Sequence, residues 1–384
     1  MQITVVTSLY PSPPRPREGV FAEERWLRMA TRGHEVRVIQ PVPLAPPLAR
    51  GAWGEIASMP SRESRGGIAI RRPRYLHLPG RALGNARRFA RRAAGLLGSP
   101  EVVVCDYAWP AAAIAPELRA RGVSCVINGR GSDVLEVSGE AGLGTHLSGF
   151  LQAAGSWCAV SRDLVENMDR LAEAPGRGRL VPNGVDTERF HPRDRAACRE
   201  AVGAPVGPLV LVVGHLIPRK DPLLALEVFL EGAPAGAHLW FLGRGPLEQD
   251  LAMEIEARGA GDRVRLLGEV SPDELSMYYG SADLLLLTSR REGRPNVVLE
   301  ALASGLPVLA TRAGGTAEIL GESPMLMSNR DPETLGGALG GLLDEPPSRE
   351  ELASMVSGLS WEASLDALEA VLEEAVMGRT AVQS

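Results

Sequence analysis

The sequence predicts an α/β protein with two doubly wound parallel sheets, each in a domain of its own. The chain has 384 residues, which is more than one ordinary hydrophobic core accommodates. Short β-rich runs alternate with helical patterns in the first half, and the same alternation restarts in the second half. This order is typical of parallel sheets covered by helices on both faces.

The individual elements follow from apolar runs and their punctuation by Gly and Pro. The strands expected in the first half are residues 3–10, 35–41, 101–106, 123–128 and 157–160, with a helix at 20–32 after the first strand. The strands expected in the second half are residues 208–214, 237–243, 264–268, 283–288 and 306–310. The helices expected between them are residues 221–231, 246–258, 271–280 and 295–304.

The domain junction is predicted where Pro, Gly and Arg accumulate, near residues 182–207. We expect one domain at residues 1–185 and a second at 186–360, with a last helix at about 361–377 packing back on the first. Ligands of such sheets bind beyond the carboxyl ends of the strands. The expected site is therefore a cleft between the two domains.

Composition excludes several classes of function. The net charge of −6 argues against a nucleic-acid partner bound by bulk positive charge. The first residues read as a strand rather than a signal peptide, and no run of about 18 apolar residues is present, which favours a cytoplasmic protein. No two aspartates stand two residues apart, and dinucleotide, P-loop and zinc-protease motifs are absent, so we expect no metal site and no cofactor.

The motif GHLIPRKDP (214–222) contains Lys220, the single lysine in a chain with 41 Lys and Arg residues together. Gly214 ends a predicted strand, and Asp221 with Pro222 begins a helix as its N-cap and N1 residues. A cation beside a helix N-terminus suits a phosphate group. Because the chain uses Arg elsewhere, a flexible point charge that reaches an oxygen cluster is favoured over a solvated surface lysine.

A second group of polar residues follows the predicted strand 283–288. Glu292, Gly293 and Arg294 lie in a loop, and Pro295 begins the next helix. Glu300 lies inside that helix among Val, Leu and Ala, where a carboxylate without partners is costly. Its carboxylate either accepts hydrogen bonds from the two vicinal hydroxyls of a ribose or forms a salt bridge to an arginine.

Together these motifs resemble the retaining glycosyltransferases of family 4, whose GT-B architecture has two facing Rossmann-like domains with a cleft between them. The similarity runs from Gly19 to the helix around Trp361. Its most specific motif is E-x7-E, here Glu292 to Glu300, accompanied by NGVD (183–186), PRK (218–220) and GG-x-x-E (314–318). The segments SPPRPREGVFAEE and RGSDV (130–134) are similar to the branch that builds bacterial cell-surface polysaccharides.

The resemblance implies a role for each matching residue. Glu300 would hold the ribose hydroxyls, Glu292 would face the donor sugar, and Lys220 would clamp the diphosphate. The backbone around 267–270 would meet the base, and Gly19 would approach the diphosphate. The implied donor-binding residues are Gly19, His215, Arg219, Lys220, Arg244, Leu267, Gly268, Glu269, Gly293, Arg294, Pro295, Asn296 and Glu300. The implied catalytic residues are Glu292, Lys220, Arg130 and Asp133.

The resemblance also implies the chemistry. Fixed cations and helix N-termini would stabilise the departing nucleoside diphosphate without a metal. Retention in this family is usually explained by attack on the face that the leaving group vacates, with the departing phosphate taking the acceptor's proton.

Two residues depart from the family pattern. His215 stands where the family usually has Arg, and an imidazole is a weaker, pH-dependent partner for an anion, for which Arg219 or Arg244 would compensate. Arg130 stands where many members have a His that contacts the sugar. Arg130 cannot act as a base, although it could bind an acidic sugar or a phosphate. The role of Asp106, where relatives often carry His, is open.

Residues 50–92 contain 11 arginines against two glutamates, Glu55 and Glu63. In the predicted helix 86–97, Phe89, Leu96 and Leu97 accompany paired arginines. We expect either an anionic membrane surface bound through residues 62–97 or an ordinary solvated basic face. A lipid-diphosphate-linked sugar would be a natural acceptor on the inner face of the cell membrane.

The sequence therefore predicts a metal-independent retaining glycosyltransferase. It would move a sugar from a UDP- or GDP-linked donor to a cell-envelope or exopolysaccharide acceptor. The alternatives are a sugar-nucleotide-binding protein without transfer activity and a sugar-nucleotide 2-epimerase of the same fold.

Overall fold

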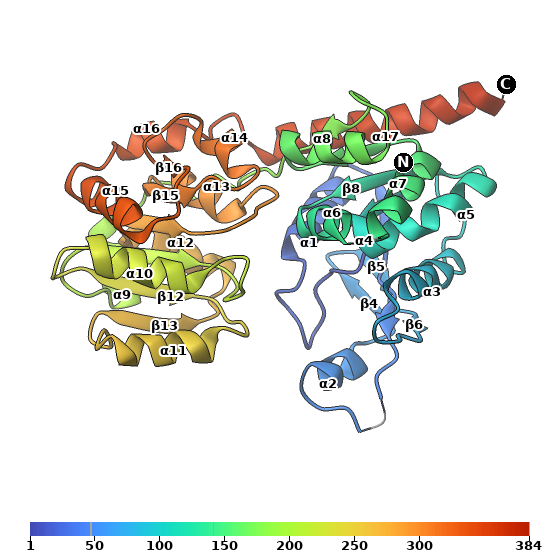
Figure 1. The fold of residues 1–384 in the computed structure, drawn as a ribbon. Coiled ribbons are helices and arrows are strands. Elements are labelled where there is room, and N and C mark those ends of the chain that lie inside the picture. The colour runs from blue at the N-terminus through green and yellow to red at the C-terminus, as the bar shows by residue number, and fades with distance from the viewer. Residues whose placement is uncertain (47, 141, 384) are drawn as a thin grey trace. The chain divides into compact units, whose positions relative to one another are not determined.

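The computed structural model describes residues 1–46, 48–140 and 142–383. The chain divides into two compact units, shown in Figure 1. The N-terminal unit consists of Met1–Pro182 and the segment from Ser364 onward, and the C-terminal unit is Asn183–Ala363. Each unit is an α/β domain with its own mainly parallel sheet, as the alternating pattern predicts.

The sheet of the N-terminal unit has eight strands in the order β10-β9-β8-β7-β1-β2-β5-β4, parallel except for the pair β4–β5. A separate small sheet pairs β3 with β6. The strands are β1 (Gln2–Val6), β2 (Glu35–Ile39), β3 (Val42–Pro43), β4 (Arg62–Arg65), β5 (Ile68–Arg71), β6 (Arg74–Tyr75), β7 (Val102–Asp106), β8 (Ser124–Gly129), β9 (Trp157–Ala159) and β10 (Arg179–Leu180).

Helices alternate with the strands along the chain and cover this sheet. They are α1 (Val20–Thr31), α2 (Gly51–Ser58), α3 (Ala82–Ala94), α4 (Ala108–Ala111), a 3-10 turn (Ala112–Ile114), α5 (Ala115–Ala120), α6 (Ser132–Gly139), α7 (Leu143–Ala154), α8 (Arg162–Leu171) and α17 (Trp361–Gln383). On α17, Leu365, Leu368 and Leu372 are buried in one core cluster with Val5 and Trp26.

The hairpin β4–β5 does not appear among the strands predicted from the sequence. Its strands have four residues each, and only Ile68 and Ile70 of β5 are buried. Alternation over so few residues is too short to stand out against the arginines around it. The central strands β7 and β8 are buried at every position, which is why their continuous apolar runs were predictable.

Of the two alternatives considered for the segment around α3, a lipid-facing surface and a solvated basic face, the structure contradicts the first for the apolar residues. Phe89 and Leu97 are buried with 1% and 2% of their surface exposed, and both pack in the core of the N-terminal unit. Only Leu96 is exposed. The apolar side of this segment is thus occupied by its own domain, and its arginines Arg87, Arg91 and Arg92 face solvent.

The sheet of the C-terminal unit has six parallel strands in the order β13-β12-β11-β14-β15-β16. They are β11 (Leu209–Val213), β12 (His238–Leu242), β13 (Val264–Gly268), β14 (Leu284–Leu287), β15 (Val308–Thr311) and β16 (Leu326–Met327). The helices are α9 (Arg195–Val202), α10 (Pro222–Gly232), α11 (Glu248–Ala257), α12 (Pro272–Ser281), α13 (Asn296–Ala303), α14 (Thr316–Leu320), α15 (Pro332–Asp344) and α16 (Arg349–Ser354).

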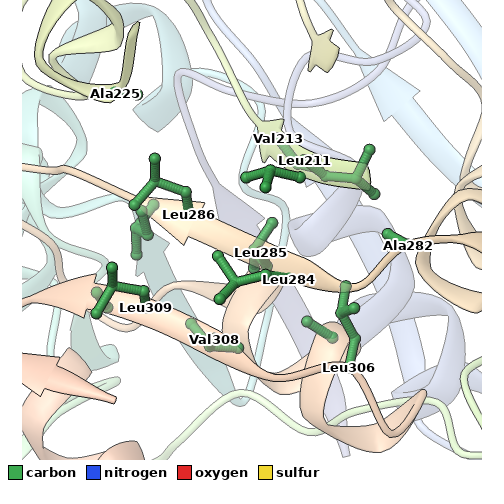
Figure 2. Close-up of a cluster of buried hydrophobic side chains, with 14 of the residues drawn as sticks. Leu211, Val213, Ala225, Ala282, Leu284, Leu285, Leu286, Leu306, Val308 and Leu309 are labelled. Atoms are coloured by element: carbon green, nitrogen blue, oxygen red, sulfur yellow. The ribbon is translucent and has the colours of Figure 1, made fainter. Parts of the chain in front are cut away.

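The core of this unit forms around the two middle strands. Figure 2 shows Leu211 of β11, Leu284 and Leu286 of β14, and Val308 and Leu309 of β15 within one buried cluster. Strands covered on both faces need apolar residues at successive positions, and the run Leu284–Leu287 supplies them. This core holds the carboxyl ends of β11 and β14 side by side.

Candidate functional site

The strand order of the C-terminal unit reverses between β11 and β14. From β11 the chain proceeds outward to β12 and β13, and from β14 it proceeds outward to β15 and β16 on the other side. Ligands of open α/β sheets bind where the strand order reverses, beyond the carboxyl ends of the strands. The loops that leave β11 (residues 214–221) and β14 (residues 288–295) carry the predicted motifs, and both emerge at this point.

These two loops bring Lys220 and Glu292 into direct contact. The Lys220 Nζ donates to Glu292 Oε1 at 2.5 Å, and the hydroxyl of Ser289 donates to the same oxygen at 2.6 Å. The other carboxylate oxygen lies 3.4 Å from Arg219 Nη1. The Glu292 side chain is 6% exposed and that of Lys220 is 18% exposed. The sequence predicted both residues at the site but not their pairing, and it missed Ser289.

The charge state of Glu292 follows from these neighbours. Burial, the largest single effect, raises the pKa of its carboxyl group, but the neighbouring groups together outweigh burial and lower the pKa below its ordinary value, with Lys220 contributing most through its charge and its hydrogen bond. The hydroxyl of Ser289 and the Arg219 guanidinium act in the same direction. Glu292 is therefore ionised at neutral pH and holds two cations at the edge of the sheet.

The turn that presents Lys220 is fixed by Asp221. This residue has a positive φ of 52° and occupies the N-cap position of α10, as expected, yet its side chain makes no capping hydrogen bond. Its carboxylate instead pairs with Arg330 at 2.6 Å and Arg290 at 2.7 Å. The Thr288 hydroxyl also donates to the Asp221 carbonyl at 2.8 Å. These contacts link the turn to the loop that carries Glu292.

The N-terminal end of α13 lies directly after Glu292. The helix starts at Asn296 with Pro295 at the N-cap position, one residue later than predicted. Asn296 Oδ1 accepts from the Asn183 side chain at 2.8 Å, and the carbonyl of Gly293 accepts from the Gly315 N–H at 3.1 Å. The motifs NGVD and GG-x-x-E thus brace this helix end from two sides.

Arg294, predicted to bind the donor, is turned toward the protein. Its side chain is 4% exposed and its Nη1 lies 3.5 Å from Glu318 Oε2. Burial lowers the pKa of this guanidinium, and the Glu318 carboxylate partly opposes that effect. Arg294 therefore connects the E-x7-E and GG-x-x-E motifs to each other.

Glu300 is partly exposed and has the Tyr279 hydroxyl as a donor at 3.0 Å. It forms no ion pair within the ranges that the structure describes, so the salt bridge considered above is not made there. Burial raises the pKa of this carboxyl group from 4.5 to about 7, against the hydrogen bond from Tyr279 and the charge of Arg189. A carboxylate held this way retains lone pairs for further donors.

The remaining predicted donor contacts lie around the ends of β11, β12 and β13. His215 is exposed, directly beyond β11. Arg244 follows β12; it pairs with Glu248 at 2.9 Å and keeps 64% of its side chain exposed. A Cβ built on Gly268 would lie 3.1 Å from Arg244 Nη2, so the guanidinium rests against this glycine. The neighbouring positions are Leu267, which is partly buried, and Glu269, which is exposed.

Gly19 has a structural reason to be glycine. Its φ is 78°, and a Cβ there would lie 2.7 Å from the carbonyl carbon and oxygen of Leu9. The start of α1 therefore packs directly on the loop that leaves β1, with no room for a side chain.

Asp106, whose role the sequence left open, forms an ion pair with Arg130. Arg130 Nε and Nη2 donate to Asp106 Oδ1 and Oδ2 at 2.7 and 2.9 Å, and both side chains are almost fully buried. Asp106 also accepts from Trp26 Nε1 at 2.7 Å and from the Asn128 amide at 2.8 Å. Burial raises the pKa of Asp106, but Arg130, Arg25 and Trp26 together outweigh burial, so the pKa is lowered. Arg130 thus has an internal partner that the sequence did not predict.

Asp133 lies beside this pair and binds backbone. Its carboxylate accepts from the N–H groups of Ala108, Arg130 and Gly131. Burial raises the pKa of the group to about 6, although the three backbone hydrogen bonds oppose the shift. Asp133 therefore shapes the loop after β8 and joins it to the start of α4.

Across the residues that the structure describes, no three His, Cys, Asp or Glu side chains gather closely enough to hold a metal ion. No helix in the described ranges is long and apolar enough to cross a bilayer.

Comparison with known proteins identifies the family. Residues 207–345 match the family model of glycosyl transferases group 1, and residues 20–189 match that of glycosyltransferase family 4. The Bacillus subtilis (strain 168) protein TuaC, assigned to teichuronic acid biosynthesis as a glycosyltransferase, is 30% identical over 346 residues, which is 85% of each chain. The D-inositol 3-phosphate glycosyltransferase of Acidothermus cellulolyticus is 32% identical over 236 residues, 55% of this chain and 51% of its own.

Solved structures show the same fold. HepE of Anabaena in complex with UDP superposes with a TM-score of 0.75 at 16% identity, over 97% of this chain and all of its own. WaaG, a glycosyltransferase involved in lipopolysaccharide biosynthesis, superposes with a TM-score of 0.69 at 18% identity, over 97% and 98%. The chain has the GT-B fold and belongs to the family 4 glycosyltransferases.

Proposed function

We propose that this glycosyltransferase transfers a sugar from a UDP- or GDP-linked donor, with retention of the anomeric configuration and without a metal ion. The acceptor is a cell-envelope or exopolysaccharide intermediate, carried on a lipid at the inner face of the cell membrane. The observation that carries the proposal is the pair formed by Lys220 and the buried Glu292 where the strand order reverses.

Lys220 and Arg219 supply the positive charge that a diphosphate requires. Both approach one ionised carboxylate in the free protein. A bound diphosphate would share these cations, with N–H groups at the start of α13 as further donors. Donors that are already fixed before the reaction stabilise developing charge without reorganisation. They take the place that a divalent cation has in many other nucleotide-sugar enzymes.

The proposed reaction needs no protein base. The bond between the anomeric carbon and the diphosphate oxygen breaks, and its electron pair leaves with the nucleoside diphosphate. The acceptor oxygen bonds to the same face of the sugar, and its proton passes to the departing phosphate oxygen. Glu292, ionised and facing the sugar, stabilises the positive charge that develops on the sugar ring. Glu300 accepts from the two ribose hydroxyls and so positions the nucleotide.

One relative supports the class of acceptor. TuaC, which is 30% identical over 85% of the chain, is assigned to teichuronic acid biosynthesis. Arg130 is engaged by Asp106, and it also lies over the Phe21 ring with its Cζ 5.0 Å from the ring centroid. We propose that this fixed guanidinium contacts the transferred sugar or its phosphate, with Asp133 holding the loop in place.

The test is a nucleotide panel followed by product analysis. Melting temperature is measured with UDP, GDP, ADP and dTDP, because a ligand at about 100 times its Kd adds roughly 2.7 kcal/mol. One responder, followed by sugar transfer with a retained anomeric signal in the presence of a chelator, supports the proposal. Binding without transfer across a wide acceptor panel favours a binding protein, and interconversion of 2-epimers favours the epimerase.

A further inference from the structure

Exposed apolar side chains gather in one stretch of the N-terminal unit. Eleven large apolar residues are exposed in the described part of the chain, and five of them fall between residues 44 and 78. Trp53 is the only tryptophan among those eleven. The five residues, which we call the apolar patch, are Leu44, Leu48, Trp53, Leu76 and Leu78.

Contacts between their segments bring most of the patch together. Strands β3 and β6 pair in parallel, and the Leu44 N–H donates to the Tyr75 carbonyl at 2.8 Å, which places Leu44 beside Leu76. The ring of Trp53 lies 6.4 Å from that of His77, between Leu76 and Leu78 in the chain. Leu44 and Leu76 are therefore neighbours on paired strands, and Trp53 lies on a helix that contacts the same segment through His77.

The patch is held in place by polar contacts of its backbone. Arg74 donates to the carbonyls of Ile56 and Met59 at 2.7 and 2.6 Å, and so holds the end of α2. The Asn85 side chain bonds both the N–H and the carbonyl of Leu78, at 2.9 and 2.8 Å. Helix α2 itself buries no residue, and Figure 1 shows it standing off the sheet of its unit. The patch is a built surface that the rest of its domain leaves uncovered.

Unpaired cations border the patch. Residues 44–81 contain seven arginines against two glutamates, and one of these, Glu55, is bound to Arg15 at 3.0 Å. Arg50 precedes α2, and Arg81 follows Leu78, whose carbonyl accepts from the Arg81 N–H. Both arginines are exposed and form no ion pair within the described residues. Apolar side chains rimmed by positive charge match the interface of an anionic bilayer.

The patch also lies on the side of the sheet where the parallel strands have their carboxyl ends, and the predicted site residues of this unit lie on the same side. Leu44 and the segment 48–58 follow β2 and β3, and the segment 76–78 follows β5 and β6. Strands β2 and β5 are parallel to β7 and β8, whose carboxyl ends carry Asp106 and Arg130. A membrane against the patch would face this same edge of the sheet.

We infer that the apolar patch inserts into the interface of an anionic bilayer, with Arg50 and Arg81 on lipid phosphates. The lipid-binding surface would thus be the exposed apolar patch and not the apolar side of α3, which is buried. Membrane binding through the patch does not depend on the proposed reaction. If the reaction is as proposed, the bilayer would deliver a lipid-linked acceptor to the edge of the sheet that carries Arg130.

The experiment measures partitioning onto phosphatidylglycerol–phosphatidylcholine vesicles by flotation at low salt. Leu48→Ser with Leu76→Ser should reduce the partition coefficient about tenfold or more, since each leucine loses part of a burial worth about 1.5–3 kcal/mol. The matched control is Val206→Ser with Met253→Ser, which removes exposed apolar residues from the C-terminal unit and should change nothing. Arg50→Gln and Arg81→Gln should each cost about fivefold, the equivalent of about 1 kcal/mol per cation.

A second readout locates the contact. Anionic vesicles should shift the fluorescence of the wild type to shorter wavelength, and Trp53→Phe should abolish the shift, because the other tryptophans are buried or partly buried. No flotation with the wild type would overturn the inference, as would equal losses in the control variant. Sedimentation that changes with patch variants, without vesicle binding, would instead assign the patch to a second copy of the chain.

Nucleotide titration of the same variants keeps the two proposals apart. The patch variants should bind the responding nucleoside diphosphate as the wild type does. A wild type that binds vesicles but no nucleotide would contradict the proposed function alone, and one that binds nucleotide but no vesicles would contradict the membrane inference alone.

Discussion

Glu292→Gln separates the two tasks that the structure gives this carboxylate. In the free protein, Glu292 Oε1 accepts a hydrogen bond from the ammonium of Lys220 at 2.5 Å. A bound diphosphate must therefore compete with Glu292 for the same cation. An amide keeps the shape and the acceptor oxygen for Ser289 but removes the competing charge. We therefore expect tighter binding of the nucleoside diphosphate together with slower transfer.

The magnitude follows from the partial burial of the pair. Two unit charges about 3 Å apart interact by roughly 5 kcal/mol at an effective dielectric constant of about 20. Arg219 and Ser289 remain, and the diphosphate only shares the cation, so a fraction of that energy is recovered. We expect an affinity gain of about 1–2 kcal/mol, or roughly fivefold to thirtyfold. Loss of the carboxylate that faces the sugar should lower the transfer rate by about a hundredfold or more.

Calorimetric titration and initial rates measure the two effects separately. The matched control is Glu254→Gln, which removes an exposed carboxylate paired with Arg258 on α11 and should change neither quantity. Weaker nucleotide binding by Glu292→Gln would refute the competition between Glu292 and the diphosphate. Undiminished transfer would refute its role at the sugar.

Three further predictions concern two other carboxylates, Glu300 and Asp106. Glu300→Gln should stabilise the protein by about 1–3 kcal/mol at pH 8 and leave it unchanged below pH 4.5. Burial raises the pKa of this carboxyl group from 4.5 to about 7, so its favourable contribution is complete below pH 4.5 and is lost as the pH rises through about 7. Denaturant unfolding at several pH values measures this, and a pH-independent difference would contradict it. In calorimetry, Glu300→Ala should weaken the binding of nucleoside diphosphates with an intact ribose more than the binding of their 2′-deoxy analogues. Equal losses of affinity would contradict the role of Glu300 at the ribose. Asp106→Asn should cost about 3–5 kcal/mol of stability, because it leaves Arg130 buried without its carboxylate; a loss below 1 kcal/mol in chemical denaturation would show that the pair is dispensable.

The fold was predictable where burial is continuous along the chain. Central strands such as β7 and β14 need apolar residues at every position, and this pattern is visible in the sequence alone. The hairpin β4–β5 was not predictable, since its strands have four residues each, the edge strand β4 buries none of them and β5 buries only alternate ones. The apolar residues of α3 illustrate a second limit, because a sequence shows that a helix has an apolar face without showing what covers it.

The site was predictable as a set of positions but not as a set of contacts. The unusual choice of lysine at position 220, together with the spacing of Glu292 and Glu300, indicated where the chemistry lies. The pairing of Lys220 with Glu292 depends on two loops, far apart in the chain, that leave neighbouring strands. The pairing of Arg130 with Asp106 likewise joins the ends of β7 and β8, so neither pair has a local signal.

The role of Lys220 is tested by calorimetric titration of the wild type and Lys220→Met with UDP and GDP. If the lysine clamps the leaving diphosphate, the variant should bind the responding nucleotide about 1.5–3 kcal/mol more weakly, which is roughly tenfold to 150-fold. The corresponding nucleoside, which has no phosphate, should bind both proteins equally. Unchanged affinity for the diphosphate in Lys220→Met, with the protein folded, would show that this lysine serves only to hold Glu292.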